Sequence, residues 1–166
     1  MILCWLKMLI YLIGPSGVGK TSCARIASML LDAQPHNMDE LCKGREFDWP
    51  FCHDVLANLE NQDHLGQTTG IVDIGAGTQT LPQLRDFLSA RTSRVILFDA
   101  PPFEVIKRNP LGIGRSPHEY ESTEYVSRRD LYSTAARVLD VTRKSQAAAG
   151  EVFIELLLAH FDVCRK

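Results

Sequence analysis

Short apolar runs alternate along this chain with longer stretches in which apolar residues recur every three or four positions. The first run, Met8 to Ile13, is continuously apolar, which is typical of a strand buried on both faces of a sheet. The runs at residues 70–74 and 94–99 have the same character, and residues 138–141 can form a further short strand. We therefore predict parallel strands buried between two layers of helices.

Helical periodicity fills the segments between these runs. The apolar residues between Lys20 and Leu31 share one helical face, which predicts a first helix over that range. Further helices are expected over about 51–59, 81–90, 101–108, 121–137 and 145–161. Residues 36–67 are otherwise irregular, and residues 109–118 are rich in glycine and proline, which predicts a mobile loop. Right-handed crossovers would bring the strand ends to one edge of the sheet, where ligands bind.

The bulk composition is that of an ordinary globular domain. The chain has 166 residues, which suits a single domain over residues 1–166 with one core. Hydrophobic residues make up 45% of the chain, charged residues 23%, and the net charge is -2. Nothing in these values indicates nucleic acid or an anionic membrane as a partner, so we expect neither. We also expect a monomer.

The cysteines and the apolar N-terminus indicate a cytoplasmic protein. The 5 cysteines are scattered and form no C-x-x-C pair, so a secreted disulfide framework is not expected. Residues 1–13 resemble a signal peptide but lack a basic region and a small-residue cleavage site, and they are too few to span a bilayer. They run directly into a glycine loop, which a buried strand should precede.

That loop, GPSGVGKT from Gly14 to Thr21, is the strongest chemical signal in the chain. It matches G-x-x-x-x-G-K-[ST], in which glycines let the backbone approach phosphates and successive N–H groups face the anion. Lys20 supplies a charge to the β- and γ-phosphates, and Thr21 supplies a hydroxyl to Mg²⁺. The predicted nucleotide-binding residues of this loop are Gly14, Pro15, Ser16, Gly17, Val18, Gly19, Lys20, Thr21 and Ser22.

Several classes of phosphate-loop protein are disfavoured. The base-reading N-K-x-D motif of switch GTPases is missing from the sequence, and motor and transport ATPases are usually much longer. A chain of this size leaves room for a nucleotide site and a small acceptor pocket. We therefore favour a compact kinase for a metabolite or nucleotide.

Four further motifs follow the loop in a fixed order, and with it they resemble the shikimate kinase family. They are Asn37-Met38-Asp39, Gly75-Ala76-Gly77, Arg108-Asn109-Pro110-Leu111 and Arg128-Arg129-Asp130-Leu131-Tyr132. The resemblance implies a three-layer α/β/α P-loop NTPase fold, similar to nucleoside monophosphate kinases, with five parallel strands in the order 2-3-1-4-5. It also implies ATP as donor, Mg²⁺ as cofactor and a small carboxylated alcohol as acceptor, shikimate above all.

The resemblance assigns acceptor-side roles to specific residues. Asp39 would orient the acceptor hydroxyl and take its proton late in the transfer. Arg128 would pair with the acceptor's carboxylate, which suits a planar two-pronged donor. Gly75, Ala76 and Gly77 would form the turn that approaches the acceptor, with Ala76 adding a methyl group where the family has glycine.

The metal, lid and adenine assignments also come from the resemblance. Asn37 replaces the family's metal-supporting aspartate, and Asp73 at the end of the second strand is a candidate to supply the missing charge. A lid is expected over about residues 109–120, where Arg108 or Arg115 would reach the transferring phosphoryl group. Arg143 and its neighbour Lys144 fall where the family places a basic side chain on adenine.

The acceptor-binding segment, about residues 36–67, departs most from the family. The family's Phe-Arg-x-x-Glu element is replaced by FDWPFCHDVLANLE, which lacks the arginine. Arg45 is the only arginine between Arg25 and Arg85, so either it replaces the missing grip or the acceptor is not shikimate. A kinase for gluconate or a nucleoside, and a non-catalytic nucleotide-binding module, therefore remain open. The histidines and cysteines of this segment match no common zinc spacing.

Overall fold

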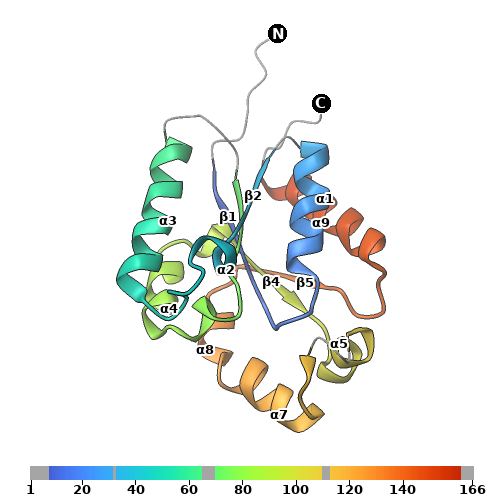
Figure 1. Ribbon diagram of the computed structural model, residues 1–166. Helices are drawn as coiled ribbons and strands as arrows, with labels where there is room; N and C mark the ends of the chain where they lie inside the picture. The colour runs from blue at the N-terminus through green and yellow to red at the C-terminus, as the bar shows by residue number, and fades with distance from the viewer. Residues whose placement is uncertain (1–7, 32, 65–69, 110–112, 162–166) are drawn as a thin grey trace.

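A single parallel sheet organises the computed structural model, which describes residues 8–31, 33–64, 70–109 and 113–161. Within these residues the sheet has 5 strands in the order β2-β3-β1-β4-β5 (Figure 1). The strands are β1 (Ile10–Ile13), β2 (Gln34–Asn37), β3 (Gly70–Asp73), β4 (Val95–Asp99) and β5 (Arg137–Asp140). The predicted fold class and strand order are confirmed.

β1 lies at the centre of the sheet because all its side chains are apolar. Tyr11 pairs with Val72 of β3 on one side and with Val95 of β4 on the other. Ile10 and Leu12 point into one hydrophobic cluster, whereas Tyr11 and Ile13 point into the other. The continuous apolar run therefore fills both cores, as expected for a strand covered on two faces.

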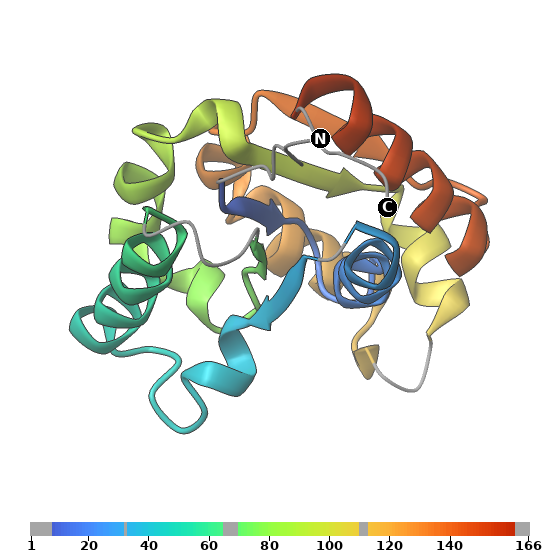
Figure 2. The ribbon, with the colours of Figure 1, turned by 90° about the horizontal axis from the view of Figure 1, so that it is seen from above.

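Helices cover both faces of the sheet, and Figures 1 and 2 show the two layers on opposite sides. One layer contains α1 (Lys20–Leu31), α5 (Pro102–Arg108) and α9 (Gln146–His160). The other contains α2 (Met38–Leu41), α3 (Trp49–His64), α4 (Pro82–Ser89) and α8 (Arg129–Tyr132). Among the described residues, no helix combines the length and apolarity that crossing a bilayer demands.

Two local expectations from the sequence are wrong. Residues 34–37, which were not assigned to a strand, form the edge strand β2; Gln34 and Pro35 there are exposed, so no apolar pattern marks it. The single helix expected over residues 121–137 is instead α7 (Pro117–Glu121), a π-helical turn η3 (Ser122–Val126) and α8. In that turn the Ser127 amide reaches the Ser122 carbonyl, which widens the helix by one residue.

We expect Phe153→Ala to lower the free energy of unfolding by about 3–5 kcal/mol, because it leaves a cavity under the sheet. Phe153 is fully buried on α9, and its ring packs edge-on against Phe98 with 5.2 Å between centroids. Chemical denaturation measures the loss. Phe103→Ala is the matched control, because Phe103 is 61% exposed. Equal losses in the two variants would contradict this packing.

Candidate active site

The phosphate loop joins β1 to α1 through a backbone that glycine alone adopts readily. Gly14, Gly17 and Gly19 have φ angles of 142°, 79° and 107°. A Cβ atom at Gly14 would also lie 2.4 Å from the carbonyl oxygen of Phe98 on β4. The loop therefore curls at the carboxyl edge of the sheet and opens α1, in the context that the motif predicts.

Lys20 begins α1 and turns its ammonium group back over the loop. Its Nζ donates hydrogen bonds to the carbonyls of Gly14 at 2.9 Å and Pro15 at 3.1 Å. Burial lowers the pKa of Lys20, whereas the negative charges of Asp73 and Glu124 oppose that shift. The cation is thus held inside the loop, where the phosphates of a nucleotide would meet it.

A cavity of about 500 Å³ opens on the outer side of the loop. Residues 17–23 line it together with Arg108, Asn109 and residues 144–146. Arg108, predicted as a lid arginine, lies here and donates to the Val141 carbonyl at 2.7 Å. The position and size of this cavity suit the base and ribose of a nucleotide.

Of the two basic residues after the last strand, one lines this cavity. Lys144 lines the cavity, whereas Arg143 does not. The Arg143 side chain is 83% exposed, its Nε lies 3.9 Å from Glu104 Oε1, and its backbone has a φ of 55°. That left-handed backbone turns Arg143 outward and leaves its neighbour facing the nucleotide side.

Thr21 and Asp73 form the polar pair that best fits a magnesium ion. The Thr21 hydroxyl donates to Asp73 Oδ2, and Asp73 Oδ1 is buried with no hydrogen-bond partner among the described residues. Those residues contain no group of three or more histidine, cysteine or acidic side chains that could hold a metal. Mg²⁺ is often bound by one or two carboxylates plus substrate phosphates, so this hydroxyl and carboxylate fit it beside a bound nucleotide.

Asn37 supports this pair rather than supplying an oxygen to it. Its Oδ1 accepts from the Glu40 amide at 3.2 Å and caps α2, whereas its Nδ2 lies 3.5 Å from Asp73 Oδ2. Asn37 and Asp73 are register partners on β2 and β3. Of the two residues predicted to support the metal, Asp73 thus keeps a buried oxygen without a hydrogen-bond partner among the described residues, whereas Asn37 turns its amide nitrogen toward it.

The predicted acceptor wall is assembled around Ala76. The Ala76 amide donates to Asp39 Oδ2 at 3.1 Å, and its carbonyl accepts from Arg128 Nη2 at 3.2 Å. A Cβ atom at Gly75 would lie 2.0 Å from Asp39 Cγ, and one at Gly77 would lie 2.9 Å from Glu46 Cβ. The structure thus brings Asp39, the turn and Arg128 together, although they are far apart in the sequence.

The Asp39 carboxyl group lies in a setting that raises its pKa. Burial raises its pKa; the hydrogen bond from the Ala76 amide and the charge of Lys20 lower it, and the charge of Asp73 raises it. The net pKa lies above the ordinary value for aspartate. Its Oδ1 is buried against the turn, since a Cβ atom at Gly75 would lie 2.0 Å from it, and a hydrogen bond from the Gly77 backbone also lowers the pKa.

The sequence reasoning missed Glu124, which connects the two halves of the site. This carboxylate accepts from the Ser16 amide at 2.9 Å, the Ser16 hydroxyl at 3.3 Å, Arg115 Nη2 at 2.8 Å and Arg128 Nη1 at 2.7 Å. Its side chain is 2% exposed. Burial alone would raise the pKa of Glu124, but the Ser16 amide, Arg128 and Arg115 together lower it, so the group is charged.

Arg115 reaches this carboxylate from the predicted lid. It also donates to Thr123 Oγ1 at 2.7 Å, and its guanidinium lies 5.2 Å from the centroid of the Tyr120 ring. Residues 110–112 of the lid lie outside the described residues. Arg108 lies on the outer side of the phosphate loop, whereas Arg115 is connected to the loop through Glu124, which accepts from Ser16.

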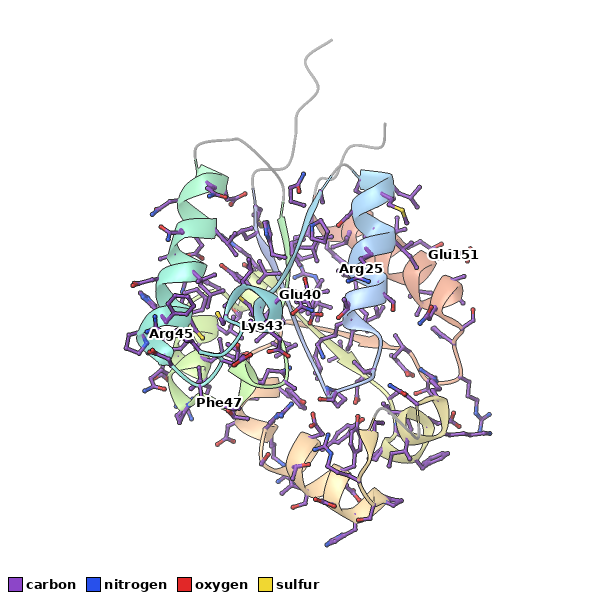
Figure 3. All side chains as sticks on the ribbon, in the orientation of Figure 1. Arg25, Glu40, Lys43, Arg45, Phe47 and Glu151 are labelled. Carbon is purple, nitrogen blue, oxygen red and sulfur yellow. The ribbon has the colours of Figure 1, made fainter. Side chains whose placement is uncertain are left out.

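Arg45 does not replace the arginine missing from the acceptor segment. Figure 3 shows it beside the start of α3, where it is paired with Asp48 and its guanidinium lies 4.2 Å from the Phe51 ring centroid. Its side chain is 55% exposed. Within the described residues, no hydrogen bond or ion pair joins Arg45 to Asp39 or Arg128. Of the two alternatives left open by the sequence, these contacts favour the one in which Arg45 is no substitute for the missing arginine.

Comparisons with known proteins agree on the fold. No family model matches the chain, and no curated protein sequence matches it either. Among solved structures, the shikimate kinase from Acinetobacter baumannii in complex with shikimate is 17% identical, with a TM-score of 0.64 over 94% of both chains. The enzyme from Aquifex aeolicus is 24% identical, with a TM-score of 0.62 over 90% of this chain and 96% of its own.

A third solved structure extends the agreement. The shikimate kinase from Bacteroides thetaiotaomicron is 17% identical, with a TM-score of 0.65 over 91% of this chain and 98% of its own. The resemblance read from the sequence motifs is therefore confirmed for the fold. The chain has a shikimate kinase-like P-loop NTPase fold of the α/β class.

Proposed function

We propose that this protein is an ATP-dependent phosphotransferase that moves the γ-phosphoryl group to a hydroxyl of a small acceptor. One observation carries the proposal: Asp39 presents a buried, unbonded carboxylate oxygen close to the phosphate loop. The charges of Lys20 and Asp39 are near enough to shift each other's pKa. A cation for phosphate and a carboxylate for a hydroxyl therefore share one site.

On the donor side, the chain holds and orients the nucleotide. The backbone amides of the loop and the ammonium of Lys20 receive the phosphates, and the cavity beside Arg108 and Lys144 receives the base. Thr21 and Asp73 would hold Mg²⁺, which neutralises phosphate charge when it is bound. Arg115 stands where a guanidinium can stabilise charge on the phosphoryl group.

On the acceptor side, Asp39 orients the hydroxyl and accepts its proton as the new bond to phosphorus forms. The hydrogen bond from the Ala76 amide fixes Oδ2 and thereby orients the whole carboxylate. Gly75 leaves the space in which the carboxylate lies. Most of the rate enhancement in this scheme comes from positioning and charge neutralisation.

A carboxylated alcohol such as shikimate is the acceptor that the resemblance implies. Arg128 is the residue that would pair with the carboxylate of such an acceptor. Of the solved neighbours, one is described as a complex with shikimate. Gluconate and nucleosides are the other acceptors to test. A nucleotide-binding module without catalytic activity is the competing function, favoured by the substitutions Asn37, Ala76 and Asn109 within the family's motifs.

We expect ATP turnover that is stimulated by an acceptor and that falls by about 10²–10⁴-fold in Asp39→Asn, because the proton acceptor is removed. Nucleotide affinity should stay unchanged in this variant. A coupled assay for ADP with shikimate, gluconate, polyols and nucleosides measures the rate. Asp54→Asn is the matched control, since the Asp54 side chain is 81% exposed on α3. Tight nucleotide binding without any stimulated turnover would support the non-catalytic module.

The raised pKa of Asp39 gives a second test. Transfer needs the carboxylate form, so the rate should rise with pH as the pH passes through that raised pKa, above the ordinary range for aspartate. A profile of kcat/KM against pH in the wild type measures this acidic limb. The residual activity of Asp39→Asn should lack the limb. An unchanged limb in that variant would assign it to another group.

A further inference from the structure

The arginine that faces the acceptor is already occupied by the protein itself. Arg128 Nη1 donates to Glu124 at 2.7 Å, and Nη2 donates to the Ala76 carbonyl at 3.2 Å. The side chains of Arg128 and Glu124 are only 8% and 2% exposed. Their opposite charges therefore interact in a dry environment, where ion pairing is strong. Only Nε of this guanidinium has no partner among the described residues.

Glu124 cannot leave this arrangement without loss elsewhere. The same carboxylate accepts from the Ser16 amide and hydroxyl and from Arg115. If Glu124 moved away, both Arg128 and Arg115 would lose their ion pair with this carboxylate. Breaking a buried ion pair strongly destabilises the folded protein. A ligand carboxylate that took the place of Glu124 on Arg128 would have to make up for all of these contacts.

The second arginine that a carboxylate would need is also missing. Arg45 is the only arginine between Arg25 and Arg85, and it is exposed and paired with Asp48. A carboxylated acceptor would thus bring a further negative charge beside Asp39 and Glu124, and it would have to share Arg128 with Glu124. Like charges placed together in a binding site weaken binding.

An uncharged hydroxyl or amide fits the remaining polar atoms better. Arg128 Nε is a donor and Asp39 Oδ1 is an acceptor, and both are buried without partners among the described residues. A hydroxyl can accept from one and donate to the other. We propose that the acceptor is uncharged where it meets Arg128, as in a polyol or a nucleoside, and that Glu124 sets this preference. The proposal rests on the phosphotransferase function proposed above.

Matched acceptor pairs test this preference without changing the protein. Shikimate is compared with its primary carboxamide, and gluconate with glucitol, so that within each pair the carboxylate gives way to an uncharged polar group. We expect the wild type to favour the uncharged member by at least about tenfold in kcat/KM, because the carboxylate is repelled. The pair with the higher kcat/KM decides the test: a higher kcat/KM for its carboxylated member than for its uncharged member would overturn the proposal.

Glu124→Gln tests the residue that sets the preference, because it removes the charge and keeps the shape. The uncharged-to-carboxylate ratio should fall by about tenfold or more in this variant as Arg128 becomes free to pair. Glu121→Gln is the matched control, because Glu121 is exposed at the end of α7. The uncharged-to-carboxylate ratio of this variant should match that of the wild type. An unchanged ratio in folded Glu124→Gln would remove Glu124 from the explanation.

A binding measurement separates this proposal from the proposed function. Calorimetry with the same pairs, on protein loaded with a non-hydrolysable ATP analogue, reports the preference even where turnover is lacking. If the uncharged acceptors bind more tightly but are not phosphorylated, the kinase function is contradicted and the preference for an uncharged acceptor stands. If the carboxylated acceptors are phosphorylated and bind more tightly than their uncharged partners, the kinase function stands and the preference for an uncharged acceptor is wrong. If Glu124→Gln does not fold, the wild-type pairs still decide the acceptor class.

Discussion

A buried carboxylate has to be matched by donors wherever the chain places it, and Glu124 meets this constraint with groups from both halves of the site. Its donors are the amide and hydroxyl of Ser16 and the guanidinium groups of Arg115 and Arg128. Ser16 and Glu124 are separated by 108 positions in the sequence. One ionised group thus fixes the phosphate loop, the lid arginine and the acceptor wall relative to each other, and the π-helical turn that carries it sets where that group lies.

The sheet supplies the second level of organisation. β1 and β3 are neighbouring parallel strands, so the loop after β1 and the acidic end of β3 meet at one edge. Asp73 pairs in register with Asn37 on β2, which places α2 and Asp39 directly beyond the same edge. The donor and acceptor halves of the site are therefore consequences of strand order, and the turn at Gly75 to Gly77 joins them because Gly75 leaves room for the Asp39 carboxylate.

The sequence predicted those parts of the molecule in which a local pattern and its structural cause coincide. The apolar run before Gly14 and the glycine loop identified β1 and α1, and the family motifs placed Asp39 beside Arg128. β2 was missed because an exposed edge strand carries no apolar pattern, and Arg45 was misplaced because spacing alone does not reveal that Asp48 pairs with it. Glu124 left one signal, its position four residues before Arg128, which suits an ion pair along a helix.

Glu124 should keep Arg128 paired while the site is loaded with nucleotide. NMR of protein labelled with ¹⁵N in its arginine side chains, with Arg128→Lys used for assignment, follows the Nε–H group of Arg128 directly. With a non-hydrolysable ATP analogue bound, we predict that this signal remains protected from exchange and shifts when glucitol is added, but not when gluconate is added. Loss of protection in the nucleotide complex, or a shift with gluconate alone, would contradict the account.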